Sequence, residues 1–421
     1  MNLSFGRRAL GLFSSAIFDQ VVLSATNFLV GFVLIRYAGD HDYALYVLVQ
    51  STMLLALTIH NSYLSGPLAI VAPSLPADER WQTIGSVKLV QRRLLRTVLL
   101  PLLALPLLGY VSGRMTGLLA AVIAAGIFAV WAALRREYLR SVLLMYSRPH
   151  TLLRVDAVYA ATLLTGVAAA LFIGKAVVVG ATCALALAAW VGGAAAHRSL
   201  ARDPGWQQAG TVSIWPRIRS LGFWSVLGAG IYWVLGQSYS YFLASSLGLT
   251  AVADVNATRL LLMPAFVLTI GVASLLGPTA ATWYAQIGIH RLVGRLLIFL
   301  GVVGLLELAY FVIIWVGRDW LVVDVLHKHI HDRDRLLILW AGVAVVGLLR
   351  DVLQCALTAM GRLQSLAWLV GVSAAVAVLL MWYGVAWWGA PAVLIGQIVG
   401  ELINLAGIIF LLRRSMRRAL V

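Results

Sequence analysis

The sequence predicts an all-α membrane protein that crosses the bilayer many times, and three observations support this fold class. Of the 421 residues, 62% are hydrophobic and only 11% are charged. The apolar residues fall into runs of about twenty, the length that a helix needs to cross a bilayer. Similar landmarks also recur at offsets of 209 to 214 residues. The formal charge of +16 is typical of basic loops on the cytoplasmic side, and we therefore expect no nucleic-acid partner.

Twelve spans fit the apolar pattern. They are expected at 13–35, 43–66, 95–112, 116–134, 153–174, 176–197, 221–245, 252–275, 294–316, 336–357, 364–386 and 391–412. An even number of spans leaves both termini on the same side. With both termini inside, the inner segments hold 24 of the 32 basic residues and the outer segments hold 7. This asymmetry predicts cytoplasmic termini.

The first span carries polar residues that a simple anchor does not need. Asp19 and Asn27 are eight positions apart and fall on roughly one face of a helix, with Gln20 beside it. An ionisable side chain inside a membrane is costly and usually faces a bundle interior or a wet cavity. Asp19 is therefore the candidate for binding a proton or another cation. The simpler alternative is that these side chains only bond to a neighbouring helix.

The chain contains two similar halves. Gly66-Pro67 recurs as Gly277-Pro278, and the basic-acidic pair Arg136-Glu137 recurs as Arg350-Asp351. Six spans per half give both halves the same orientation, as in transporters built from parallel repeats. The expected organisation is an N-terminal six-helix bundle (1–197), a cytoplasmic linker (198–219) and a C-terminal six-helix bundle (220–421). We interpret the two charged pairs as an inner gate that bonds across the halves, or as ordinary charges at the membrane boundary.

Substrate sites in such folds lie between the repeats, and the first two spans of each half carry the unusual polar residues. Arg259 is the only basic residue that the charge count assigns to neither the inner nor the outer segments, because it lies within the eighth span, and Asn256 shares its helical face. We interpret Arg259 as an attractor for anionic groups, although a long side chain can also snorkel to the surface. The other candidate substrate-binding residues are Gln20, Asn27, Arg36, His60, Asn61, Gln237, Tyr239 and Tyr241.

Two connections stand out by their charge. The segment 78–96 is basic and partly amphipathic; we expect an ordinary inner loop, with a helix on the membrane surface as the alternative. The segment 317–335 holds an HxHxH string that would bind metal only as a strand, and a solvated charged loop is the preferred interpretation. We expect no metal, no cofactor and no catalytic residue. The chain has no GxxxxGK[ST] motif for ATP hydrolysis.

The opening of the chain resembles a known family. SATNFL in the first span, then IRYAG and an acidic-aromatic turn before the second span, is similar to the start of bacterial polysaccharide exporters. These are oligosaccharide-lipid flippases of the multidrug/oligosaccharidyl-lipid/polysaccharide exporter superfamily. In residues the resemblance lies mainly in 13–73, 135–160 and 220–285. It implies two six-helix bundles that form a V and open alternately to each side of the bacterial inner membrane.

The resemblance also implies a substrate, an undecaprenyl-diphosphate-linked oligosaccharide that is flipped for polysaccharide biosynthesis. Membrane lipids, a proton or sodium ion, a polysaccharide polymerase and glycosyltransferases are the implied partners. One alternative is a cation-coupled multidrug antiporter of the same superfamily, which would favour an acidic cavity. Another is a membrane glycosyltransferase, polymerase or ligase, which usually needs a large outer loop. We expect a transporter and not an enzyme.

Overall fold

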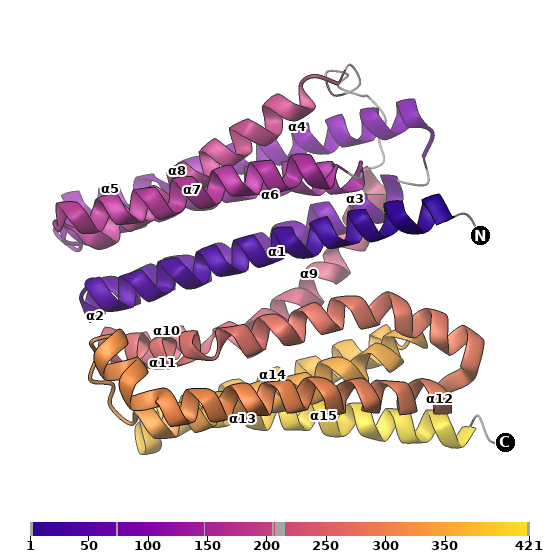
Figure 1. The fold of residues 1–421 in the computed structure, drawn as a ribbon. Coiled ribbons are helices and arrows are strands. Elements are labelled where there is room, and N and C mark those ends of the chain that lie inside the picture. Colours follow the sequence, from indigo (N-terminus) through magenta and orange to yellow (C-terminus); the bar gives the residue numbers. More distant parts are fainter. Residues whose placement is uncertain (1–2, 73–74, 147, 204–205, 207–214, 419–421) are drawn as a thin grey trace. The chain divides into compact units, whose positions relative to one another are not determined.

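The computed structural model describes residues 3–72, 75–146, 148–203, 206 and 215–418, and every regular element in that part of the chain is a helix (Figure 1). The chain divides into two compact units, Met1–Gly230 and Ile231–Val421. Much of the predicted linker, at 204–205 and 207–214, lies outside the described residues. The predicted all-α, multi-span class is confirmed.

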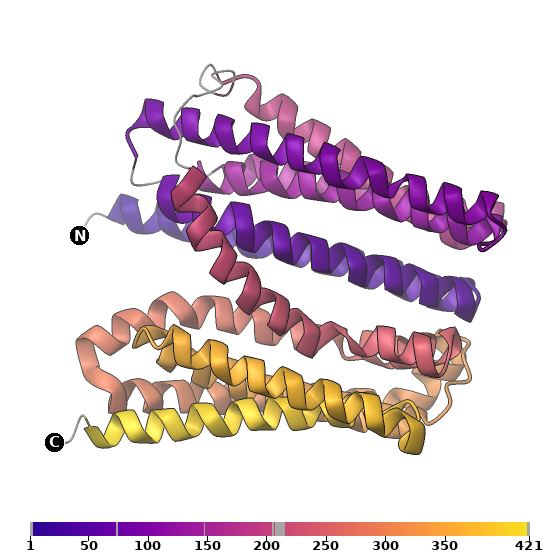
Figure 2. The ribbon, with the colours of Figure 1, turned by 180° about the vertical axis from the view of Figure 1, so that it is seen from behind.

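The first unit contains six helical passages, counted over the described residues. They are α1 (Leu3–Tyr37), α2 (Asp40–His60) continued by the π-helix η1 (Asn61–Ser65) and α3 (Gly66–Val71), α4 (Ala77–Leu102) continued by α5 (Ala104–Val111), α6 (Gly117–Met145), α7 (Pro149–Ile173) and α8 (Val177–Leu200). Figure 2 shows these helices from behind. The segment 78–96 belongs to α4, so the loop prediction is wrong. Ile84, Val87 and Leu95 of α4 are buried, because they form one apolar helical face against the rest of the bundle.

The second unit follows with α9 (Trp215–Gln237), which crosses the boundary between the units, and then with α10 to α15. These are α10 (Tyr239–Ser246), α11 (Leu249–Leu261), α12 (Met263–Asp319), the π-helix η4 (Trp320–Val325), α13 (Arg333–Ala359), α14 (Leu363–Trp388) and α15 (Pro391–Arg418). Its core includes Leu292, Leu296, Val352, Ala356 and Ile408. Within the described residues of both units, nine helices are long and apolar enough to cross a membrane, or ten with one bent pair.

The predicted eighth span is broken. Leu249–Leu261 and Met263–Gly277 meet at an angle of 60°, where Pro264 follows the break and cannot supply a helical N–H. Helix α12 then runs through the predicted connection between the eighth and ninth spans. It is interrupted at Gly288, whose φ of 72° lies in the left-handed region. The apolar pattern does not predict the break after Leu261, whereas Gly288 lies within the predicted connection.

Helices α7 and α8 pack closely through small residues. A Cβ added at Gly166 would lie 2.6 Å from the Cβ of Ala184, and one added at Gly180 would lie 2.6 Å from the Cβ of Ala170. Such small-residue contacts let membrane helices approach without a hydrophobic driving force between them. The close approach of α8 fixes the position of α7, which carries Asp156.

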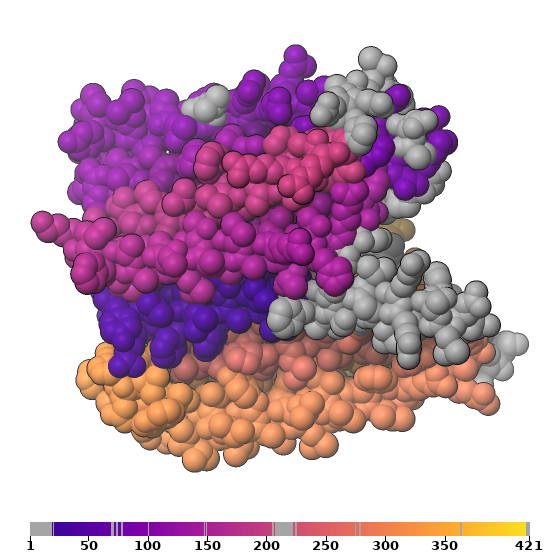
Figure 3. Space-filling model, turned by 45° about the horizontal axis from the view of Figure 1, so that its top comes forward, coloured from indigo at the N-terminus to yellow at the C-terminus, as the bar shows by residue number. Residues whose placement is uncertain are grey.

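The connection at 317–335 forms the last turn of α12, the π-helix η4 and a short irregular stretch before α13. Residues in this range appear in orange at the left of Figure 3. His329 and the residues around it form no strand, and His327 has a positive φ of 55°. Among the described residues no group of three or more His, Cys, Asp or Glu side chains is placed to hold a metal ion.

Candidate functional site

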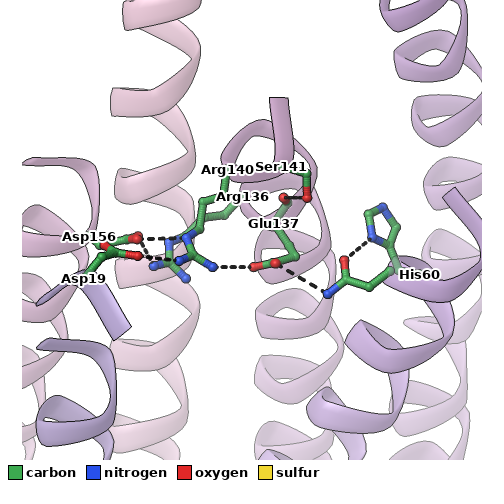
Figure 4. A network of polar contacts seen from close by, with 8 residues as sticks. Asp19, His60, Arg136, Glu137, Arg140, Ser141 and Asp156 are labelled. Atoms are coloured by element: carbon green, nitrogen blue, oxygen red, sulfur yellow. Dashed lines mark hydrogen bonds and ion pairs between the residues drawn. The ribbon is translucent and has the colours of Figure 1, made fainter. Parts of the chain in front are cut away.

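Arg140 on α6 is the centre of a buried ionic network in the first unit (Figure 4). Its Nη2 donates to Asp19 Oδ2 on α1 at 2.8 Å, and its Nε donates to Asp156 Oδ2 on α7 at 2.8 Å. Its Nη1 donates to Glu137 Oε2 at 3.1 Å, one turn back on α6. One guanidinium thus uses all three of its nitrogens and ties three helices together, as its fixed fork of donors allows.

Arg136, one turn before Arg140 on α6, adds a second guanidinium to the network. Its Nη2 donates to Asp156 Oδ1, so Asp156 accepts from both arginines through its two oxygens. The guanidinium carbon of Arg136 also lies 3.8 Å from the centre of the Tyr159 ring. Gly192 on α8 leaves the room for this side chain, because a Cβ there would lie 3.2 Å from Arg136 Cδ and Nε.

The network holds more carboxylates than guanidiniums. Asp19, Glu137 and Asp156 face Arg136 and Arg140, so full ionisation leaves one surplus negative charge in a buried place. Asp19 is 3% exposed, and its Oδ1 has no hydrogen-bond partner. This arrangement can hold one proton or one monovalent cation.

A chain of neutral polar side chains extends the network to α2 and α4. Asn61 Nδ2 donates to Glu137 Oε1 at 3.4 Å, and Asn61 Oδ1 lies 3.4 Å from His60 Nδ1. The other ring nitrogen of His60 lies 3.0 Å from Gln91 Nε2, which also donates to the Leu134 carbonyl at 2.9 Å. Asn61 begins the π-helix η1, and such local widening of a helix is frequent at functional sites.

Sequence reasoning missed Asp156 and the role of Arg140. Asp156 is fully buried within the predicted fifth span, so the criterion that singled out Asp19 also applies to it. Arg140 was counted only as an inner basic residue. The sequence signal for this network was the cluster of arginines and carboxylates at the end of the fourth span and the start of the fifth, namely Arg136, Glu137, Arg140 and Asp156.

Arg259 of α11 is the centre of a second polar cluster, in the second unit. Its Nη1 donates to Tyr239 Oη at 3.0 Å and to Gln237 Oε1 at 3.3 Å. Tyr239 in turn donates to Asn256 Oδ1 at 2.8 Å. Four of the predicted substrate-binding residues therefore form one hydrogen-bonded group.

Aromatic rings surround the Arg259 guanidinium, whose carbon lies 5.4 Å from the Trp340 ring centre, 5.8 Å from Tyr239 and 5.9 Å from Phe266. Among the described residues, no carboxylate lies within ion-pair distance of Arg259. The chain bends after Leu261 and Met263 begins α12, so the helical face that carries Asn256 and Arg259 ends there. Half-buried and without an ionic partner, this guanidinium has donors free for an anion.

The predicted gate residues have partners inside their own units. Arg136 bonds to Asp156, and Glu137 bonds to Arg140 and Asn61. In the second unit Arg350 donates through Nη1 to Glu401 at 2.9 Å and through Nη2 to Tyr232 Oη at 3.0 Å and Asp351 at 2.9 Å. These contacts lie within each unit, and the interpretation of the pairs as a gate that bonds across the halves stays a prediction. Both arginines are buried, and a buried guanidinium needs a local carboxylate.

The remaining predicted residues are scattered. Asn27 is half-buried on α1, two turns after Asp19. Arg36 lies near the end of α1 with its guanidinium carbon 5.3 Å from the Tyr37 ring centre. Tyr241 is at the surface of α10 beside Trp233, with 5.9 Å between ring centres. The side chain of Gln20 lies outside the described residues.

No family model matches the chain, and no curated protein sequence matches it significantly. Solved structures do match. An inward-facing multidrug resistance transporter of the MATE family, in the MOP superfamily, has a TM-score of 0.78 at 14% identity and covers 95% of each chain. The lipid II flippase MurJ in an inward closed conformation has a TM-score of 0.71 at 11% identity, over 96% of this chain and 87% of that one.

A third matching structure is a MOP superfamily transporter from Pyrococcus furiosus, with a TM-score of 0.68 at 13% identity over 97% of this chain and 95% of that one. Its description reports a binding pocket of reversed polarity. At these identities the similarity shows the fold. The chain therefore has the fold of MOP superfamily transporters, on which both a drug transporter and a lipid-linked flippase are built.

Proposed function

We propose that this chain is a flippase that moves a diphosphate-linked, lipid-anchored oligosaccharide across the membrane by alternating access. The observation that carries the proposal is Arg259. It is a guanidinium within a bent membrane helix, held by the neutral Tyr239 and Gln237 and without a carboxylate partner among the described residues. A cation at such a depth is costly unless it serves a purpose. An anionic substrate would supply the missing partner.

The chemistry of the cluster fits such a substrate. A guanidinium offers forked donors to phosphate oxygens. Amide groups and tyrosines, here Asn256, Gln237 and Tyr239, are suited to sugar hydroxyls and sugar faces. The polyprenyl tail can remain in the lipid and needs no protein pocket. The remaining predicted residues, including Asn27, Arg36 and Tyr241, belong to this proposal as further substrate contacts.

We propose that the Asp19 network supplies the ion coupling. Its three carboxylates and two guanidiniums leave room for one proton or sodium ion, and Asp19 carries the unpartnered oxygen. The proposed setting is the bacterial inner membrane with both termini in the cytoplasm. A polysaccharide polymerase and glycosyltransferases are the proposed partners in the same pathway. We propose no catalytic role.

A cation-coupled multidrug antiporter is the second candidate. The fold likeness to a MATE family transporter and the surplus carboxylate in the first unit favour it. Against it, Asp19 is already paired with Arg140, and Arg259 would repel a cationic drug. The polarity of the Arg259 cluster therefore favours the flippase.

Transport assays in reconstituted proteoliposomes distinguish the flippase from the multidrug antiporter. A fluorescent polyprenyl-diphosphate oligosaccharide in the inner leaflet becomes accessible to a membrane-impermeant quencher only when it is flipped. We expect flipping of this probe and no uptake of a cationic dye such as ethidium. Dye uptake under a proton gradient without flipping would support the antiporter and contradict the flippase. The matched probe with a neutral anchor in place of the diphosphate should be flipped much less.

A further inference from the structure

A basic pocket lies within the first unit, next to the polar chain that extends the Arg140 network, with which it shares Gln91. It has a volume of about 420 Å³ and is formed by α4, α6 and α8. Its basic residues are Lys88, Arg92 and Arg96 on α4, Arg135 on α6 and His197 on α8. The three residues on α4 recur every four positions and so form one stripe along the helix. Four side chains with fixed positive charge thus converge on one cavity.

Among the residues that the structure describes, no acidic side chain lines this pocket. The charged groups that act on Lys88 are Arg92 and Arg135, and those that act on His197 are Lys88, Arg92 and Arg135, so the nearby charges repel one another. The ammonium of Lys88 is instead 4.0 Å from the centre of the Trp206 ring. The positive charges of the pocket therefore have no carboxylate among its described lining residues to neutralise them. In the Arg140 network, by contrast, each guanidinium is paired with a carboxylate. An external anion would remove the repulsion.

The position of the pocket along the helices indicates what kind of anion reaches it. Residues 97–111, 117–134 and 177–196 contain no charged side chain, so they form the apolar parts of the three helices. Arg96, Arg135 and His197 each lie directly at one end of these apolar parts. The pocket therefore sits where the hydrocarbon ends, and this is the depth of lipid head groups. Leu95 and Trp131 add apolar surface beside the charges.

We propose that this pocket binds the phosphate group of an anionic membrane lipid. Arg92 and Arg135 would hold the phosphate oxygens, since guanidiniums give forked donors to phosphate. Lys88 and Arg96 would add point charges at the rim, and the acyl chains would lie along the apolar surface. Arg92 and Arg96 are exposed, which gives the head group access from the bilayer. The site does not depend on the proposed transport activity.

Native mass spectrometry of the purified full chain in detergent tests this proposal. Phosphatidylglycerol is added in one arm, phosphatidylcholine in a second and inorganic pyrophosphate in a third. We expect one phosphatidylglycerol to bind at least roughly tenfold more tightly than phosphatidylcholine, because nearby basic residues each strengthen the binding of an anionic head group. The double variant Arg92→Gln/Arg135→Gln should lose this preference.

Arg93→Gln is the matched control, because Arg93 is exposed on the same helix at the same depth but does not line the pocket. It should bind phosphatidylglycerol like the wild type. If the double variant fails to fold, the exposed Arg92→Gln alone should still weaken binding severalfold. The proposed binding site would be overturned if Arg92→Gln and Arg93→Gln lost the same affinity for phosphatidylglycerol. It would also be overturned if the double variant still preferred phosphatidylglycerol over phosphatidylcholine. Pyrophosphate that binds as tightly as the lipid would overturn the lipid as its ligand.

Discussion

Arg140 and Asp19 are 121 residues apart in the chain, and their side chains meet with 2.8 Å between Nη2 and Oδ2. The contact joins α6 to α1 inside the first unit. Asp156 on α7 accepts from the same guanidinium. The two carboxylates differ in their surroundings, because Asp156 also compensates Arg136 whereas Asp19 has an oxygen without a partner. Asp19 can therefore be neutralised at little cost, and Asp156 cannot.

Asp19→Asn and Asp156→Asn should separate coupling from stability. Asp19→Asn leaves two carboxylates for two guanidiniums, so the protein should fold with its stability changed by less than about 1 kcal/mol. Its flipping should lose its response to a proton gradient. Asp156→Asn leaves Arg136 buried without a carboxylate and should cost about 3–5 kcal/mol of folding free energy.

Thermal unfolding of both variants in detergent and flipping at two external pH values measure these effects. The charged groups that face Asp19 in the described residues are Arg140 and Asp156, so a change in pH dependence on mutating Asp19 reports on this network. Wild-type flipping with wild-type pH dependence in Asp19→Asn would remove Asp19 from the coupling mechanism. Equal stability of the two variants would contradict the assignment of Asp19 as the surplus carboxylate and of Asp156 as the one that Arg136 requires.

The sequence was sufficient to predict most of the membrane helices. It was not sufficient to predict which polar side chains pair between them. Apolar runs of about twenty residues mark most membrane helices, because the bilayer fixes their length. The break at Leu262 interrupts a continuous apolar stretch, so hydropathy does not register it. Gly288 lies in a predicted connection that the structure forms mostly as helix. Arg259 was found because it is a charge inside an apolar run.

The pairs made by Arg140 could not be read from local spacing, since Asp19 and Asp156 lie on different helices. Only the packing of α1, α6 and α7 brings them together. The same reason explains why the partners of Arg136 and Arg350 within their own units were not predicted. Sequence position at a span end predicts a boundary charge, while burial decides which neighbour has to neutralise it.

Gly192 and Gly193 form a matched pair for testing how Arg136 is held. A Cβ at Gly192 would lie 3.2 Å from Arg136 Cδ, whereas one at Gly193 would make an ordinary contact of 3.6 Å with its Cα. Replacing either glycine by alanine raises helix propensity by a similar amount. Gly192→Ala should therefore lower the melting temperature or the flipping rate relative to Gly193→Ala. Identical behaviour of the two variants would show that Arg136 has room to move.

The Arg350 cluster should be the main ionic support of the second unit. Arg350 is 3% exposed and pairs with Glu401, which is 5% exposed. Glu401→Ala removes this buried partner and should cost about 3 kcal/mol or more. Asp351→Ala removes a more exposed partner on the same guanidinium and should cost less. Melting temperatures in detergent test the ranking, and a larger loss in Asp351→Ala would contradict it.

The most direct test of the central claim is the flipping rate of Arg259 variants in proteoliposomes at equal protein content, with the polyprenyl-diphosphate probe. Arg259→Ala should lose most activity, and Arg259→Lys should keep part of it, since lysine retains the charge but lacks the forked donors. Arg335→Ala, an exposed arginine at the start of α13, is the control and should flip like the wild type. Arg259→Ala flipping at the wild-type rate would contradict an anion site at Arg259.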